Sequence, residues 1–178
     1  MLQKYNKWKV LGVFFENPNP RPAFQLREIS RHAGIAPTSV KRYLDGLEKE
    51  DLIIKELHRV HKYPMYWANR ANENFRQLKK IDMIISIRES GLLDYLRETC
   101  MPDAIVLFGS AARGEDLKDS DIDIFLLCKE KKLELQRYEN RLKRKISVRF
   151  SKSFDKEPTE LKNNIINGVI LHGYLKVF

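Results

Sequence analysis

Two aspartates placed two residues apart, Asp121 and Asp123, are the side chains of this sequence best suited to chemistry. They lie at the start of an apolar run, Ile122–Cys128, that predicts a β-strand, so both carboxylates lie on one face of that strand. Carboxylate and phosphate oxygens are the ligands that Mg²⁺ prefers, and two such ions can stabilise the attacking and leaving oxygens of an in-line transfer. The pair therefore predicts a Mg²⁺ site with a catalytic role.

A glycine and a serine, Gly109-Ser110, follow a second apolar run, Ala104–Phe108. Gly109 permits close approach of the backbone, and Ser110 with the amides after it can hold a triphosphate where a helix begins. Arg113 can neutralise phosphate charge, although a surface role fits it equally well. Taken alone, Gly109-Ser110 is typical of a tight turn and Ser120-Asp121 of a turn or cap. Their spacing relative to the two strands favours a nucleotide site.

The segment Val106–Ile124, VLFGSAARGEDLKDSDIDI, resembles the signature of the minimal nucleotidyltransferases of the polymerase-β superfamily. In that signature, strand-Gly-Ser is followed about ten residues later by Asp-x-Asp entering a strand. The stretch Gly168–Gly173 resembles the family's C-terminal helix and strand, so the resemblance covers residues from about 90 to 178. It implies an NTP and Mg²⁺ as ligands and Asp121 and Asp123 as catalytic and metal-binding residues. The nucleotide-binding residues that it implies are Gly109, Ser110, Arg113, Gly114 and Ser120.

The sequence departs from this family where a third acidic residue is expected, on a neighbouring strand. The candidate strand, Ile146–Phe150, carries Ser147 and Arg149 on its polar face. One hypothesis is that Arg149 pairs with Asp121 or Asp123 in place of a metal ion. The rival is that Asp155, farther along the chain, completes the acidic set. Because a missing carboxylate weakens a metal site and removes a general base, the sequence leaves catalysis open.

The first 70 residues predict three helices followed by two strands. The helices are expected near Lys4–Glu16, Leu26–His32 and Pro37–Glu50, and the strands at Leu52–Leu57 and Tyr63–Ala68. Gly34 suits a helix end and Pro37 a helix start. This order, with the residues from Leu26 to Leu44, resembles the bacterial and archaeal winged helix–turn–helix proteins.

That resemblance implies DNA binding through the third helix and the tip between the strands. With Val40, Leu44 and Leu47 buried, hydroxyls and cations are left exposed near the start of the third helix. Arg42 is the candidate for a base edge and Lys41 for a phosphate. The alternative is that this module docks another protein or RNA. The predicted DNA-binding residues are Thr38, Ser39, Lys41, Arg42, Arg59 and Lys62.

Residues 71–100 predict helix, divided at Gly91, that connects the two parts and offers an element for a homodimer. The predicted domains are thus 1–70, a linker at 71–100, and 101–178. A charged helix is expected over Lys131–Arg144, and helix or helix and strand over Leu161–Leu175. The fold class is α+β, with a winged helix first and an α/β nucleotidyltransferase domain last.

The charge of the 178-residue chain is +9, from 33 basic and 24 acidic residues. Residues 1–70 hold 13 basic and 7 acidic side chains, which favours a polyanion such as nucleic acid, or solubility alone. No apolar run reaches the roughly 20 residues that a membrane span needs. Cys100 and Cys128 make no disulfide framework, and we expect a reducing cytoplasmic location.

The sequence as a whole predicts a DNA-binding protein, a regulator or antitoxin-like protein, whose nucleotidyltransferase domain binds a metal–nucleotide. The alternative is an active minimal nucleotidyltransferase that modifies a HEPN-type toxin or a small molecule, with the winged helix used for docking that partner. Neither the acceptor nor the preferred NTP follows from the residues.

Overall fold

The computed structural model describes residues 5–19 and 22–176 and has an α+β fold. The chain divides into two compact units, Met1–Asp82 and Met83–Phe178, and the boundary falls inside a helix, α4 (Glu73–Ser90). Among the described residues no helix has the length and apolar character needed to cross a membrane.

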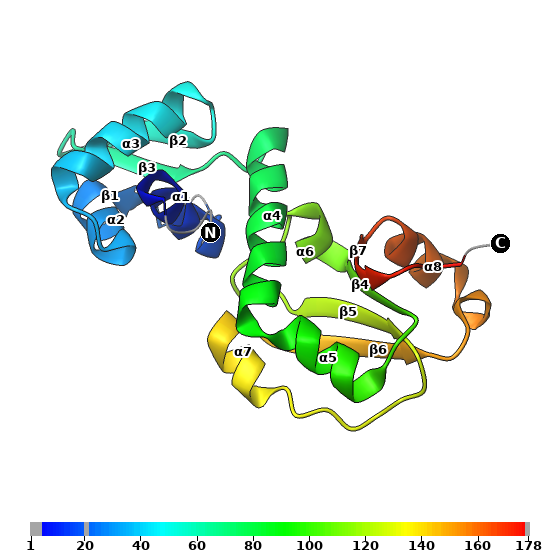
Figure 1. Ribbon diagram of the computed structural model, residues 1–178. Helices are drawn as coiled ribbons and strands as arrows, with labels where there is room; N and C mark the ends of the chain where they lie inside the picture. Colours follow the sequence, from blue (N-terminus) through cyan, green and yellow to red (C-terminus); the bar gives the residue numbers. More distant parts are fainter. Residues whose placement is uncertain (1–4, 20–21, 177–178) are drawn as a thin grey trace. The chain divides into compact units, whose positions relative to one another are not determined.

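The described part of the N-terminal unit contains, besides the first half of α4, three helices and a three-stranded antiparallel sheet (Figure 1). In chain order the elements are α1 (Asn6–Glu16), β1 (Phe24–Gln25), α2 (Leu26–Ala33), α3 (Pro37–Lys49), β2 (Ile53–Leu57) and β3 (Pro64–Ala68). β3 lies between β1 and β2. The predicted helices and strands are thus present, with small shifts at their ends, while Lys4 lies outside the described residues.

Local signals in the sequence explain where α2 and α3 begin and end. Gln25 and Glu28 form a capping box at the start of α2, in which the Gln25 amide donates to Glu28 Oε2 over 2.7 Å. Gly34 ends α2 in the left-handed region at φ 65°, and Pro37 occupies the first turn of α3. The core that these helices share is fully buried at Val10, Phe14, Ile29, Val40, Leu44 and Leu47.

The segment expected to be a linker is built into the two units. It forms α4 and α5 (Leu92–Cys100), which meet at Gly91 with φ 81°. Phe75 and Leu78 of α4 pack in the core of the N-terminal unit, whereas Ile87 packs in that of the C-terminal unit. The predicted boundaries at residues 70 and 100 therefore do not coincide with the compact units, because apolar side chains on both halves of this segment are needed to complete the two cores.

A four-stranded mixed sheet forms the centre of the C-terminal unit within the described residues. After α5 the chain runs through β4 (Ala104–Phe108), α6 (Gly109–Arg113), β5 (Ile122–Leu127), α7 (Gln136–Leu142), β6 (Ile146–Ser151), the 3₁₀ helix η2 (Phe154–Lys156), α8 (Thr159–Ile166) and β7 (Val169–Gly173). The strand order is β6-β5-β4-β7; β4 runs antiparallel to both β5 and β7, while β5 and β6 are parallel.

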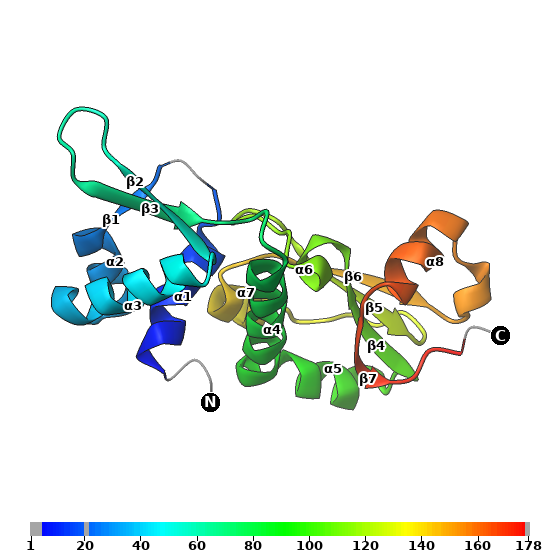
Figure 2. The same ribbon diagram turned by 90° about the horizontal axis from the view of Figure 1, so that it is seen from above.

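Helices cover both faces of this sheet, and the strands sort their side chains between them. α5 and α7 lie on one face and α8 on the other (Figures 1 and 2). On the first face Ile105, Leu107 and Ile124 pack with Leu92 and Leu96 of α5. On the second face Val106 and Phe125 pack with Phe154 and Ile165 in a smaller cluster. Asp123 and Ser147 lie on this second face as well, by the register of β5 and β6. They do not belong to the smaller apolar cluster.

The charged helix expected over Lys131–Arg144 is shorter than predicted. Only Gln136–Leu142 is helical, and Lys143 ends it in the left-handed region at φ 53°. Leu133 and Leu135, before the helix, pack against the core as irregular chain. The closing segment is the helix α8 followed by the strand β7.

Candidate nucleotide site and nucleic-acid face

The two aspartates lie where three strands of the C-terminal sheet meet. Asp123 pairs with Phe108, the last residue of β4, and with Ser147 on β6. Asp121 precedes β5 by one residue, is exposed, and shares the face of Asp123. The carboxylates therefore stand beside the point where β4 ends and α6 begins, next to Gly109 and Ser110.

Gly109 approaches the carboxylate of Asp123 so closely that no side chain fits there. A Cβ atom on Gly109 would lie 2.4 Å from Asp123 Oδ2, and the residue has φ 72°. Both the contact and the backbone angle favour glycine. The sequence predicted that Gly109 allows a close approach of the backbone. In the structure the group that the backbone approaches is the Asp123 side chain.

The charges around Asp123 favour a cation. Burial and the neighbouring carboxylate of Asp121 raise the pKa of Asp123, while Arg144 and a hydrogen bond from Ser147 lower it. Two carboxylates that disfavour each other's charge are relieved by a divalent cation, and oxygen ligands suit Mg²⁺. Asp121, Asp123 and Ser147 are the residues that could hold such an ion.

The strand next to the aspartates, β6, carries no carboxylate at the position where a third acidic residue was expected. The register of β5 and β6 places Ser147 opposite Asp123 and Arg149 opposite Phe125. Within the described residues no group of three or more histidine, cysteine or acidic side chains could hold a metal ion. Ser147 is therefore the residue that occupies the place of a third acid.

Both hypotheses about this position are wrong in this structure. The Arg149 guanidinium lies 2.9 Å from Glu157 Oε2 and not beside the aspartates, because its strand position is two residues farther from them than Ser147. Hydrogen bonds from Ser151 and Arg149 lower the pKa of Glu157. Asp155 follows the far end of β6, in η2, since β6 runs away from the aspartates. It cannot complete the acidic set.

The other predicted nucleotide-binding residues lie on α6 and the loop after it. Ser110 is half-buried on α6, whereas Arg113 is exposed and pairs with Glu115 over 2.8 Å. Gly114 ends α6 with φ 70°. The Ser120 hydroxyl accepts a hydrogen bond from the Leu117 amide over 2.8 Å, which gives Ser120 the turn-forming role that was its alternative reading.

Arg144 is a functional candidate that sequence reasoning missed. Its Nη1 donates to Asp116 Oδ2 over 2.5 Å, and its Nε donates to the Ser120 carbonyl over 2.7 Å. Asp116 is 2% exposed. Arg144 thus holds the loop between α6 and the aspartates from the start of β6. Among the many charged residues of this sequence, nothing marks this pair, because the contact spans 28 positions.

The residues predicted to bind DNA lie on two parts of the N-terminal unit. Thr38, Lys41 and Arg42 are exposed and Ser39 is half-buried on the first turns of α3, where Arg42 lies over the Tyr43 ring at 5.4 Å. Arg59 and Lys62 are exposed in the turn between β2 and β3.

Two further features of this unit were not predicted from the sequence. His58 stacks on Tyr63 at 4.6 Å and on His61 at 5.3 Å, which gives the β2–β3 turn an aromatic side. A hollow of about 470 Å³ beside the start of α2 is lined by Arg27 and Arg31 among others. The sequence signal that could have found it is the pair of arginines four residues apart on α2.

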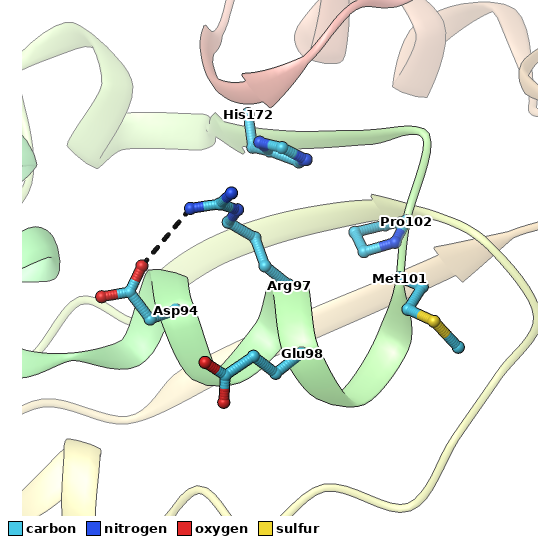
Figure 3. Close-up of a pocket in the computed structure, with 6 residues that line it drawn as sticks. All are labelled: Asp94, Arg97, Glu98, Met101, Pro102 and His172. Atoms are coloured by element: carbon cyan, nitrogen blue, oxygen red, sulfur yellow. Dashed lines mark ion pairs between the residues drawn. The ribbon is translucent and has the colours of Figure 1, made fainter.

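A second hollow, in the C-terminal unit, is separate from the aspartates. It measures about 290 Å³ and is lined by the end of α5 and by β7, at Asp94, Arg97, Glu98, Met101, Pro102 and His172 (Figure 3). Arg97 and Asp94 form an ion pair of 3.5 Å there. Since Met101 and Pro102 precede β4 and the aspartates face its other end, this hollow contains none of the predicted site residues.

Comparison with protein families supports the resemblance for the second half of the chain. Residues 90–174 match the family model described as Polymerase beta, Nucleotidyltransferase. No curated protein and no solved structure matches the chain. The match spans the sheet, the aspartates and the glycine-serine turn, so this part of the chain is similar to the nucleotidyltransferases of the polymerase-β family.

Proposed function

We propose that this chain is a DNA-binding regulator or antitoxin-like protein whose C-terminal unit binds a Mg²⁺–nucleotide and transfers nucleoside monophosphate slowly or not at all. The observation that carries this proposal is the pairing of Ser147 with Asp123. The metal ligands and the glycine turn are retained, and the third carboxylate is replaced by a hydroxyl.

Each residue of the proposed site has a defined role. Asp121 and Asp123 hold Mg²⁺, which would neutralise phosphate charge when bound. Gly109 keeps the backbone against Asp123, and Ser110 with the amides of α6 faces the phosphates. A carboxylate at position 147 could accept the proton of an attacking hydroxyl, but the Ser147 hydroxyl is not a base near neutral pH. Binding without efficient transfer follows.

The DNA-binding half of the proposal is supported by the arrangement of the N-terminal unit. Its order of helices and strands, the left-handed turn at Gly34, and the exposed Lys41 and Arg42 on α3 fit a winged helix–turn–helix. A homodimer through α4 is part of the proposal, and light scattering tests it. A monomer at working concentrations contradicts that part alone.

The alternative function is an active transferase acting on a HEPN-type protein or a small molecule. The close fit of Gly109 against Asp123 favours it, because it brings the turn that is expected to hold the phosphates against a predicted metal ligand. Labelled nucleotide transfer to a co-expressed partner would support this alternative and contradict the slow or absent transfer proposed here.

Thermal unfolding tests the proposal directly. The wild-type chain and the Asp121→Ala/Asp123→Ala variant are heated with and without Mg²⁺ and each NTP. At about 100 times the Kd, binding stabilises the folded chain by roughly 2.7 kcal/mol, or at least about 5 °C in Tm. We expect the shift in the wild type and its loss in the variant. No shift with any nucleotide contradicts nucleotide binding.

A further inference from the structure

The positive charge of residues 103–178 is concentrated in one segment. Residues 129–152 hold 10 basic and 3 acidic side chains, whereas the rest of 103–178 holds 5 basic and 9 acidic ones. The segment contains α7, the turn after it, and β6. Such a local excess of cations indicates a polyanionic partner.

The part of this segment nearest the aspartates lies on an edge strand. β6 pairs with β5 and is the last strand of the sheet on that side. The Lys145 carbonyl accepts a hydrogen bond from the Ile122 amide over 2.9 Å, so Lys145 stands beside Asp121. By the alternation of a strand, Lys145, Ser147 and Arg149 share the face of the aspartates, and all three are exposed.

The row of cations is longer than a single nucleotide site. Lys145 and Arg149 are four residues apart, or about 13 Å along the strand. A nucleotide held at Asp121 and Asp123 lies beside Lys145, which leaves Arg149 beyond it. Lys143, exposed in the preceding turn, extends the row in the other direction.

The row lacks the apolar anchors of a protein interface. Ser147 stands between the two cations on this face, while Val148 and Phe150, on the other face, pack against the core. Interfaces between proteins have aromatic and aliphatic centres, whereas phosphate backbones are bound by rows of cations and hydroxyls. The chemistry of this row therefore fits a phosphodiester backbone.

We propose that the α7–β6 turn and β6, with Lys143, Lys145, Ser147 and Arg149, bind the backbone of a single nucleic-acid strand. This surface is distinct from α3, and it does not depend on whether the aspartates bind a nucleotide.

Two carboxylates beside this row already have partners. Glu157 pairs with Arg149, and Glu139 accepts a hydrogen bond from the Ile146 amide over 3.0 Å. Without a bound cation, the negative charges of Asp121 and Asp123 repel the phosphates of a strand. The strand is therefore expected to bind more tightly with Mg²⁺ than without it.

The experiment uses the full chain with Lys41→Ala and Arg42→Ala, so that contacts through α3 are removed. Binding of labelled single-stranded poly(U) RNA and poly(dT) DNA is measured against salt concentration, with Mg²⁺ present. The test variant adds Lys143→Glu and Lys145→Glu. The matched control adds Lys156→Glu and Lys176→Glu, which are exposed, lie outside residues 129–152 and change the net charge equally.

We expect the test variant to lose at least tenfold in affinity and the control less than threefold. Because each phosphate contact on a single strand contributes about 0.7 to the salt slope, removing two lowers the slope by about 1.4. Weaker binding of DNA than of RNA would assign the strand to RNA through its 2′-hydroxyls, and equal binding would assign it to the shared backbone. Equal losses in test and control, or no binding by the parent protein, would overturn the proposal.

Folding of the variants is checked separately. The Tm of the test variant without ligand should stay within about 2 °C of the parent, as expected for exposed side chains. In the Asp121→Ala/Asp123→Ala variant, strand binding should persist while any nucleotide-dependent shift is lost. That contrast separates failure of this inference from failure of the nucleotide site.

Discussion

Ser147 lies opposite Asp123 in the parallel β5–β6 pair, beside the carboxylates that could hold a cation. Replacing it by aspartate adds a third oxygen donor to this group. We predict that Ser147→Asp raises Mg²⁺ affinity at least tenfold, because a third carboxylate strengthens the site, and that nucleotide transfer increases. Calorimetric titration with Mg²⁺ measures the affinity. Ser147→Ala is the control and should not gain; unchanged affinity in Ser147→Asp would contradict the assignment.

Gly109 is the second residue whose identity the geometry dictates. A methyl group there meets Asp123 Oδ2 at 2.4 Å in a backbone at φ 72°. Gly109→Ala should therefore displace Asp123, destabilise the chain by about 1–3 kcal/mol and abolish the nucleotide-dependent rise in Tm.

The matched control for this substitution is Gly12→Ala. Gly12 lies within α1 and has no atom within 4 Å of an added Cβ. Alanine in a helix interior should be neutral or stabilise by up to about 1 kcal/mol. If the two variants change Tm alike and Gly109→Ala still binds nucleotide, the close approach has no role in the site.

The buried ion pair of Arg144 and Asp116 is expected to stabilise the chain as a unit. Their side chains are 11% and 1% exposed, so removing one partner leaves the other charge buried. Arg144→Met should cost about 3–5 kcal/mol, and Arg144→Met/Asp116→Leu clearly less than the sum of the two single changes. Urea unfolding of all four proteins measures this coupling. Additive losses would show that the pair is not a unit.

Among the helices and strands, those whose ends are set by neighbouring residues in the sequence could be predicted. The glycine and proline that bound α2 and α3, and the apolar runs of β4 and β5, act through neighbouring residues in the chain. For the same reason the Asp121–Asp123 spacing and Gly109 could be singled out.

The elements that sequence reasoning missed depend on distant partners. β1 has two residues and exists because Phe24 and Gln25 pair with Tyr66 and Met65 of β3. The short α7 reflects Leu133 and Leu135 packing on the core in place of a continuous helix. The partners of Arg144 and Arg149 likewise follow from the register of strands and not from the local sequence.

For the N-terminal unit, we predict that the start of α3 binds DNA. Lys41→Ala/Arg42→Ala should weaken binding to duplex DNA and lower the salt slope by about 0.9, since Lys41 is the expected phosphate contact and each such contact contributes about 0.9. Binding to a short mixed-sequence duplex across a salt series measures both quantities. Lys9→Ala/Lys80→Ala removes the same charge from α1 and α4 and should leave the slope nearly unchanged. Equal effects of the two variants would mean that α3 is not the DNA-binding face.

For the whole molecule, the two units have separate cores that share one helix. The N-terminal core includes Leu44 and Phe75, and the C-terminal core includes Ile87 and Leu96. Because α4 contributes side chains to both cores, the stability of one unit could depend on the other through this helix. Whether the chain unfolds in one step or two therefore depends on how strongly α4 couples them.

We predict two unfolding transitions in calorimetry, because each unit buries its own core. Leu44 is fully buried in the N-terminal unit, so Leu44→Ala should cost about 2–5 kcal/mol and lower one transition only. Mg²⁺ with the preferred nucleotide should raise the other transition only. The counterpart substitution, Leu96→Ala, should lower the nucleotide-sensitive transition. A single transition moved by all three changes would instead mean that α4 joins the units into one cooperative structure, and the nucleotide site would then be able to influence DNA binding through the stability of that helix.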